Sequence, residues 1–191
     1  MVCDPPVIVY DACVLYSFNL RNLLVQLAVD GLVAARWTDR IQNEWVRSLS
    51  KTGKFSHARI LTVRDLMDTV LPKANVRNYE QHEDCISLPD SNDRHVLAAA
   101  IEARATIILT WNVKHFPSAE LAEHNIAASD PDTFLTILYR ANAETVFAVV
   151  EAARANLRIS EPTIEQYLRA LQDQGLRSFA SIVRAGMSSK S

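Results

Sequence analysis

The sequence contains few cysteines, no excess of basic residues and no long hydrophobic run. Its three cysteines, Cys3, Cys13 and Cys85, form no Cys-x-x-Cys pair, which argues against a disulfide framework or a zinc ribbon. They are typical of small buried side chains in a reducing cytoplasm. The formal net charge is −2, so the protein has no overall positive potential that would attract nucleic acid. Any binding of nucleic acid must therefore come from a local, metal-assisted site.

No apolar segment approaches the roughly 20 residues that a membrane span needs. The apolar start at Val7–Tyr10 is too short for a signal peptide, so we expect a cytoplasmic protein that binds no membrane. The chain has 191 residues, of which 49% are hydrophobic and 22% are charged. This composition is typical of a soluble globular protein with one core domain and an appendage.

Short apolar runs alternate with helical patterns along the first two thirds of the chain. Val7–Tyr10 is a continuous apolar run that ends at Asp11, which is typical of a strand buried on both faces of a sheet. Strands that alternate with helices predict an α/β fold around a central parallel sheet. Further strands are predicted at 32–35, 105–110 and 126–128, and a strand at 85–88 is possible.

Helices are predicted wherever apolar residues recur with helical spacing. Thr38 is the predicted N-cap of one helix, and Asp90 is the predicted N-cap of another. No strand candidate remains after about residue 142, so we predict a core domain at 5–140 and a C-terminal helical extension at 141–191. The predicted helices are 17–29, a segment from 38, 55–70, 90–105, 118–124, a segment from 130, 143–157, 163–171 and 177–187.

Several polar side chains are predicted to meet at one rim of the sheet. Parallel sheets place their sites beyond the carboxyl ends of the strands, where Asp11 and the segment 110–112 follow two strands. The helices that connect the strands begin at the same edge. Glu44 and Asp93, which lie in the first two turns of such helices, are therefore expected at this rim too. Three acids at one rim repel one another, and a hard divalent cation relieves that repulsion. The pattern therefore predicts metal-assisted hydrolysis of a phosphodiester.

These residues resemble the PIN-domain family, in particular the VapC-type toxins of bacterial toxin–antitoxin pairs. The likeness covers roughly residues 5–140 and is most specific in the block Asp90–Pro117. The resemblance implies a three-layer α/β/α PIN-like fold with a central parallel sheet, plus C-terminal helices. It also implies an endoribonuclease that acts on RNA, is restrained by a cognate antitoxin and forms a homodimer.

The resemblance also assigns roles. Asp11, Glu44 and Asp93 take the places of the acids that bind Mg²⁺ or Mn²⁺, and Glu44 is the candidate acceptor for a proton from the attacking water. Thr110 and Asn112 are expected to orient ligands or substrate. The side chains expected to contact the phosphates of the substrate are Arg94, Lys114 and His115.

Two positions depart from the family pattern. Asn112 stands where many members carry a fourth Asp, and His115 stands where related sequences have Asp before Phe. Fewer negative charges weaken metal affinity, so we favour one firmly held ion. The same departures leave open a catalytically weak or inactive PIN module that only binds RNA or protein.

The three acids also allow other interpretations. Each acid alone has a structural explanation: helix capping for Asp93, a turn for Asp11 and a solvated helix face for Glu44. A phosphoacceptor signalling domain is disfavoured because the expected pair of acids at the start of the fold is absent. A phosphatase with an Asp nucleophile needs a second Asp two residues later, where this chain has Cys13. His95 fits either a phosphate contact or a packed helix residue.

Overall fold

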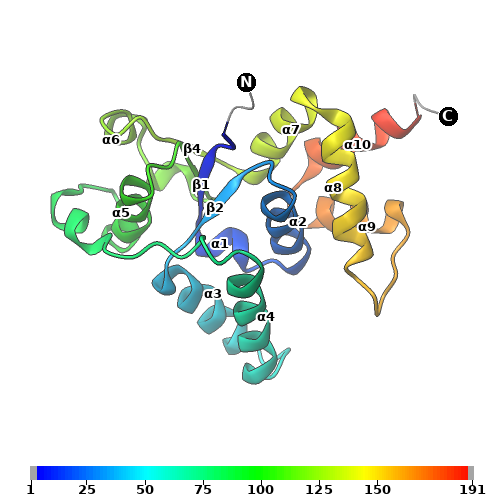
Figure 1. The fold of residues 1–191 in the computed structure, drawn as a ribbon, viewed down its shortest axis with the longest axis horizontal. Helices are drawn as coiled ribbons and strands as arrows, with labels where there is room; N and C mark the ends of the chain where they lie inside the picture. Colours follow the sequence, from blue (N-terminus) through cyan, green and yellow to red (C-terminus); the bar gives the residue numbers. More distant parts are fainter. Residues whose placement is uncertain (1–3, 189–191) are drawn as a thin grey trace.

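Four parallel strands form the central sheet (Figure 1). The fold is that of a computed structural model, which describes residues 4–188; Cys3 lies outside this range. The prediction of an α/β fold around a parallel sheet is confirmed. The strands follow the spatial order β2 (Ala34–Arg36), β1 (Val7–Tyr10), β3 (Ile107–Leu109) and β4 (Ala127–Ser129).

The register of the sheet brings the carboxyl ends of its strands to one edge. Tyr10 at the end of β1 lies opposite Leu109 at the end of β3, and Leu109 lies opposite Ser129 at the end of β4. Residues that follow these strands therefore emerge side by side. This edge is where a doubly covered parallel sheet places its site.

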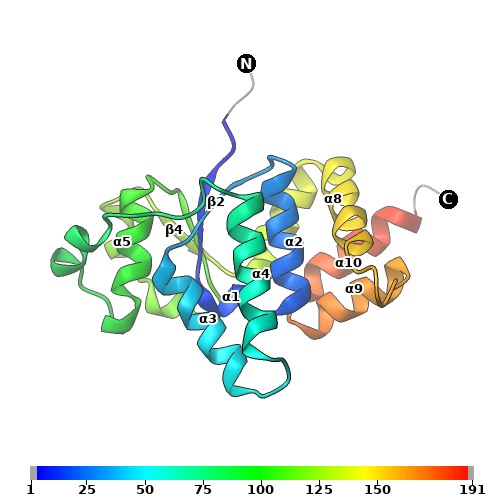
Figure 2. The same ribbon diagram turned by 60° about the horizontal axis from the view of Figure 1, so that its bottom comes forward.

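Helices cover both faces of the sheet. Figure 1 and Figure 2 show α5 (Arg94–Glu102) on one side of the strands and α2 (Phe18–Val29) on the other. Ile8, Val9 and Ile108 are consequently fully buried. Such two-sided burial explains why β1 and β3 are continuous apolar runs with no alternation of polar residues.

The remaining elements connect or extend this frame. Among the described residues, no helix combines the length and the apolar character needed to span a membrane. These elements are α1 (Ala12–Leu15), α3 (Asp39–Lys51), α4 (His57–Val70), the 3₁₀ helices η1 (Glu80–Cys85), η2 (Ser91–Asp93) and η3 (Val113–His115), α6 (Ser118–Ala122), α7 (Pro131–Ala141), α8 (Ala143–Ala155), α9 (Ile164–Asp173) and α10 (Arg177–Ser188).

Two local predictions are wrong. The possible strand at 85–88 is absent, since Cys85 ends η1 and the next residues have no strand partner. The helix predicted from Asp90 begins instead at Arg94. Asp90 accepts a 2.9 Å hydrogen bond from the backbone N–H of Asn92, which closes the tighter turn η2 in place of a first α-helical turn. By contrast, the Thr38 cap is confirmed, because its hydroxyl accepts the N–H of Ile41 at 3.1 Å.

The C-terminal helices pack onto the rest of the chain. The Gln174 side chain accepts the backbone N–H of Leu20 at 3.2 Å and also the Ser17 hydroxyl. Asp132 in α7 accepts the N–H of Phe179 at 2.8 Å and so caps the start of α10. The domain boundary after residue 140 stays a prediction, but these bonds tie both sides of it together.

Candidate active site

Asp11 lies directly after β1 and is nearly buried, with 6% of the residue exposed. Its Oδ2 accepts a 2.6 Å hydrogen bond from the Thr110 hydroxyl and a 3.1 Å one from the Cys13 thiol. The Thr110 hydroxyl in turn accepts the backbone N–H of Asn112 at 3.0 Å. Both bonds to Asp11 end on Oδ2, so Oδ1 has no partner within the described part of the chain. The carboxylate is therefore held in one orientation with one oxygen left over.

Glu44 lies in the second turn of α3 and is held by two basic side chains. Its Oε1 is 3.1 Å from His95 Nε2 and 3.6 Å from Arg40 Nε. His95 is 1% exposed, and its Nδ1 has no hydrogen-bond partner among residues 4–188. His95 is thus a packed residue of α5 that contacts Glu44, and its burial keeps it from reaching a phosphate.

Asp93 ends η2, and its Oδ2 lies 2.7 Å from His115 Nδ1 in η3. Burial raises the pKa of Asp93, and the nearby charges of Asp11 and Asp90 add to this, while the His115 hydrogen bond opposes it. Burial is thus the main reason that ionisation of Asp93 is disfavoured, and its two acidic neighbours add to it.

One cavity of about 440 Å³ joins the three acids. Asp11, Glu44 and Asp93 line it together with Asn112, and no lysine or arginine of the described residues lines it. Three carboxylates without a lining cation match the donor set that Mg²⁺ or Mn²⁺ takes in proteins. The residues present therefore fit a hard divalent ion. The other residues around the cavity are Ala12, Cys13, Tyr16, Trp45 and Ser48.

The Cys13 thiol borders this cavity but is a poor nucleophile. Burial, with a further contribution from the Asp11 charge, raises the pKa of Cys13 to about 12. The thiol donates to Asp11, and its sulfur accepts the backbone N–H of Trp111 at 3.2 Å. A protonated thiol in these bonds supports the loop after β3.

The structure brings together some of the predicted site residues and not others. Asn112 lines the cavity, Thr110 lies behind Asp11, and His115 contacts Asp93. Arg94 does not line the cavity, and its buried Nε has no partner among the described residues. Lys114 is exposed in η3 and also lies outside the cavity lining. Phosphate contacts by Arg94 and Lys114 stay predictions.

A second cavity, of about 500 Å³, adjoins the first at Glu44. Two arginines of α3, Arg40 and Arg47, line it together with Asn43 and Asn92. Sequence reasoning missed both arginines. The available signal is their spacing, because positions 40, 43, 44 and 47 share one face of a helix. That face carries the Glu44 carboxylate together with cationic and amide donors.

Comparison with known proteins agrees with this geometry. A PIN-domain family model matches residues 7–114, more than half of the chain, and a model of the VapC50 C-terminal domain matches residues 131–185. The chain therefore belongs to the PIN-domain family, and the resemblance drawn from its sequence is confirmed. The three-layer arrangement with C-terminal helices agrees with a PIN-like fold.

A curated relative points in the same direction. A protein named "Putative ribonuclease VapC50" from Mycobacterium tuberculosis is 56% identical to this chain over 43 residues. The match covers 22% of this chain and 25% of the relative, so it spans about a quarter of that protein's length. No solved structure matches the chain.

Proposed function

We propose that this protein is a Mg²⁺- or Mn²⁺-dependent endoribonuclease and the toxin of a toxin–antitoxin pair. One observation carries the proposal: Asp11, Glu44 and Asp93, far apart in the sequence, line one cavity that no described lysine or arginine lines. Membership of the PIN-domain family and the name of the curated relative support nuclease activity on RNA.

Each residue has a proposed role. Asp11 and Asp93 bind the ion, and Glu44 binds it directly or through water and accepts a proton from the attacking water. Thr110 fixes Asp11 through the 2.6 Å bond, and Asn112 presents an uncharged amide to ligand or substrate. A divalent ion held there would lower the pKa of a bound water molecule and neutralise negative charge on the phosphodiester.

The adjoining cavity offers a path for the RNA backbone. Arg40 and Arg47 lie on the same helical face as Glu44, so a phosphate beside them is close to the acids. Local cations of this kind fit a chain whose net charge is −2, because they attract phosphates without an overall basic field. Arg94, Lys114 and His115 remain proposed phosphate contacts.

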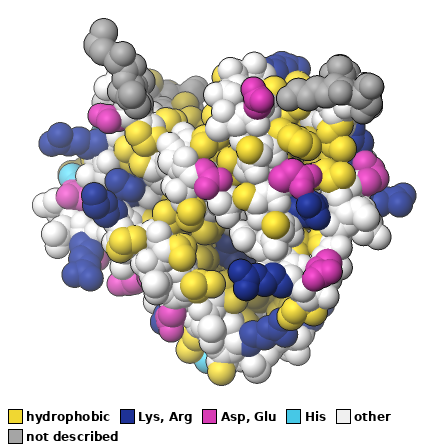
Figure 3. Space-filling model, turned by 45° about the vertical axis from the view of Figure 1, so that its right-hand side comes forward, with side chains coloured by type: hydrophobic (Ala, Val, Ile, Leu, Met, Phe, Trp, Pro, Cys, Tyr) yellow, Lys and Arg dark blue, Asp and Glu magenta, His cyan; other side chains and the backbone are white. Residues whose placement is uncertain are grey.

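An exposed apolar groove supports a protein partner. It lies between α2, α4 and the residues after α8, and Figure 3 shows hydrophobic side chains gathered around a hollow on this side of the molecule. Exposed apolar patches of this kind mark interaction surfaces, and we propose that the antitoxin binds here. The apolar residues that line the groove are Phe18, Val25, Val29, Val63, Leu66, Met67, Val70 and Leu157.

Purified protein incubated with RNA tests the enzymatic part of the proposal. We expect cleavage in Mg²⁺ or Mn²⁺, none in EDTA, and none in Asp11→Asn. Asp84→Asn is the matched control, because Asp84 is exposed and lies outside the cavity lining. Cleavage that persists in EDTA or in Asp11→Asn rejects the proposal.

Expression in cells tests the toxin part. We expect growth arrest that the product of a neighbouring antitoxin gene relieves, and Leu66→Asp in the groove weakens that relief without changing RNA cleavage. Arrest that no neighbouring gene relieves contradicts the pairing. We also propose that the protein forms a homodimer and is located in the cytoplasm, as expected from its sequence.

One observation favours the second candidate, an inactive PIN module. The family resemblance implies acids at the positions of Asn112 and His115, and the His115 imidazole occupies one oxygen of Asp93. A module of this kind binds RNA without cutting it. Binding at the same affinity in wild type and Asp11→Asn, with no product in either, identifies that function.

A further inference from the structure

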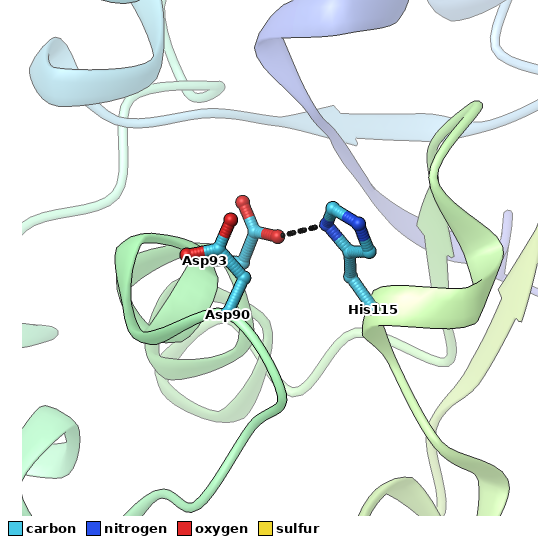
Figure 4. A group of neighbouring side chains, drawn as sticks. All are labelled: Asp90, Asp93 and His115. Carbon is cyan, nitrogen blue, oxygen red and sulfur yellow. Dashed lines mark hydrogen bonds and ion pairs between the residues drawn. The ribbon is translucent and has the colours of Figure 1, made fainter.

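A second group of possible ligands lies beside the three acids. Asp90, Asp93 and His115 each offer one ligand atom, and these atoms lie within 4.8 Å of one another. Figure 4 shows the two carboxylates at the start of the α5 segment and the imidazole opposite them on the η3 turn. Asp93 also lines the cavity with Asp11 and Glu44, so its carboxylate belongs to both groups.

We propose that Asp90, Asp93 and His115 form a site for a first-row transition ion such as Mn²⁺, with the His115 imidazole as a nitrogen ligand. The site adjoins the Asp11–Glu44–Asp93 centre and shares Asp93 with it. This inference rests on the proposed metal-dependent function and adds to it, because it states which ion the second site selects. A carboxylate in place of the His115 imidazole would lack this selectivity.

Ligand chemistry supports the choice of ion. Mg²⁺ prefers oxygen ligands and keeps its water, whereas imidazole suits transition ions. Two carboxylates with one imidazole are a mixed oxygen and nitrogen set. Such a set favours Mn²⁺ and the later first-row ions over Mg²⁺.

Local structure fixes two of the three side chains. The Asp90 Oδ1 accepts the backbone N–H of Asn92 at 2.9 Å and its side-chain amide at 3.0 Å, so Oδ2 has no partner within residues 4–188. The backbone N–H of His115 donates to Asn112 at 2.8 Å, and the next residue, Phe116, is buried. The two turns thus present an oxygen and an imidazole toward each other across Asp93.

Charge also favours a cation at this position. The ligand oxygens of Asp93 and Asp90 lie within 4.8 Å of each other, and Asp11 lines the cavity that Asp93 also lines. The His115 bond at 2.7 Å satisfies only Oδ2 of Asp93. A divalent ion in contact with Asp90 and Asp93 offsets the repulsion that a single hydrogen bond leaves in place.

Electron paramagnetic resonance on the full chain loaded with Mn²⁺ tests the site. Pulsed measurements detect the magnetic coupling between Mn²⁺ and a coordinated ¹⁴N nucleus. We expect this coupling in the wild type, its replacement by a ¹⁵N pattern when the protein is labelled with [¹⁵N]histidine, and its loss in His115→Asp. Labelling needs no substitution, so a folding defect in a variant does not spoil the test. Absence of coupling in the wild type overturns the inference.

Matched variants and competition with Mg²⁺ sharpen the result. His124→Asp is the control, because His124 is exposed and lies outside the group, and it keeps the coupling. In His115→Asp the preference for Mn²⁺ over Mg²⁺ falls by about tenfold or more, whereas in His124→Asp it is unchanged. Coupling that persists in His115→Asp shows a different nitrogen ligand and rejects the site.

The test of the Asp90–Asp93–His115 site can fail or succeed independently of the test of RNA cleavage. Asp11→Asn keeps the nitrogen-coupled ion, because Asp11 is not in the group, while RNA cleavage is lost. A protein that shows the His115 coupling but cuts no RNA has the metal site without the nuclease. A protein that cuts RNA with oxygen-bound Mn²⁺ alone is the nuclease without this site. Loss of the coupling in Asp11→Asn contradicts a site distinct from the first.

Discussion

The Thr110 hydroxyl donates a 2.6 Å hydrogen bond to Asp11 Oδ2 and thereby joins the ends of β3 and β1. Thr110 is fully buried. Together with the Cys13 thiol, which donates to the same oxygen, this bond leaves Oδ1 of Asp11 available in the cavity. It also explains why a hydroxyl residue follows the apolar run of β3.

Replacing Thr110 tests that relationship. Thr110→Val keeps the shape and removes the hydroxyl, so we expect a loss of about 1–3 kcal/mol of stability and a 10–100-fold weaker affinity for Mn²⁺. Thr110→Ser retains the donor and is the control. Urea unfolding and Mn²⁺ titration measure the two effects. Equal Mn²⁺ affinity in the two variants would show that the Thr110 hydroxyl does not support metal binding.

Gly175 and Trp111 link the C-terminal helices to the site. Gly175 has φ of +103°, and a Cβ there lies 2.9 Å from Trp111 Cη2, next to Asn112. Gly53 has φ of +66° with nothing within 4 Å of an added Cβ. Gly53→Ala therefore measures the free-energy cost of the backbone conformation alone, without a steric clash. We expect Gly53→Ala to cost about 1 kcal/mol and Gly175→Ala about 2–4 kcal/mol, with slower RNA cleavage only in the latter. Similar losses in the two variants, measured by thermal unfolding, contradict the packing role.

Arg47 in the second cavity tests the path of the RNA backbone. Arg47→Gln removes a cation that lies on the face of Glu44, so RNA affinity falls and the dependence of affinity on salt weakens by about one unit of slope. Arg169→Gln changes an exposed arginine of α9, which is outside that cavity, and leaves both quantities unchanged. Fluorescence anisotropy over a range of salt concentrations measures them. An unchanged salt slope in Arg47→Gln excludes a phosphate contact there.

Asp93 predicts how stability depends on pH in the metal-free protein. Burial, with the charges of Asp11 and Asp90, raises the pKa of Asp93 above its ordinary 3.8. An acid whose pKa is raised by folding stabilises the fold below its unfolded pKa, and this contribution is lost as the pH rises through the folded pKa. At pH 7 the ionised carboxylate is therefore unfavourable. We expect Asp93→Asn to raise the urea midpoint there, with the gain disappearing toward pH 4 and below.

In the presence of Mn²⁺ we expect the wild type to be more stable than Asp93→Asn. At a concentration of 100 times Kd, a bound ion stabilises the wild type by about 2.7 kcal/mol, and Asp93→Asn gains far less. A metal-free Asp93→Asn protein that is less stable than the wild type at pH 7 contradicts the claim that burial makes the ionised Asp93 carboxylate unfavourable. The same result also weakens the case for an ion at Asp93.

The sequence predicted the frame of this molecule because the signals are local and strong. Val7–Tyr10 and Ile107–Leu109 are buried strands, and Thr38 caps α3, as their residue types indicate. The topology of a parallel sheet then brings Asp11, Glu44 and Asp93 to one cavity. The catalytic and metal-binding roles of these residues stay predictions until they are measured.

The features that sequence reasoning missed depend on competing local bonds or on packing. Asp90 closes a 3₁₀ turn through its side chain, which delays α5 to Arg94. The contact of His95 with Glu44 crosses from α5 to α3, and no spacing in the sequence encodes it. The approach of Gly175 to Trp111 likewise requires the fold of the C-terminal helices.

The role of Asp93 in a metal-dependent nuclease site is measured by single-turnover cleavage of RNA in Mn²⁺. The proteins compared are the wild type, Asp93→Asn and the control Asp84→Asn. We expect cleavage by wild type and Asp84→Asn. In Asp93→Asn we expect a rate at least about 100-fold lower, because Asp93 is the carboxylate common to both groups of ligands. Equal rates in wild type and Asp93→Asn contradict that role.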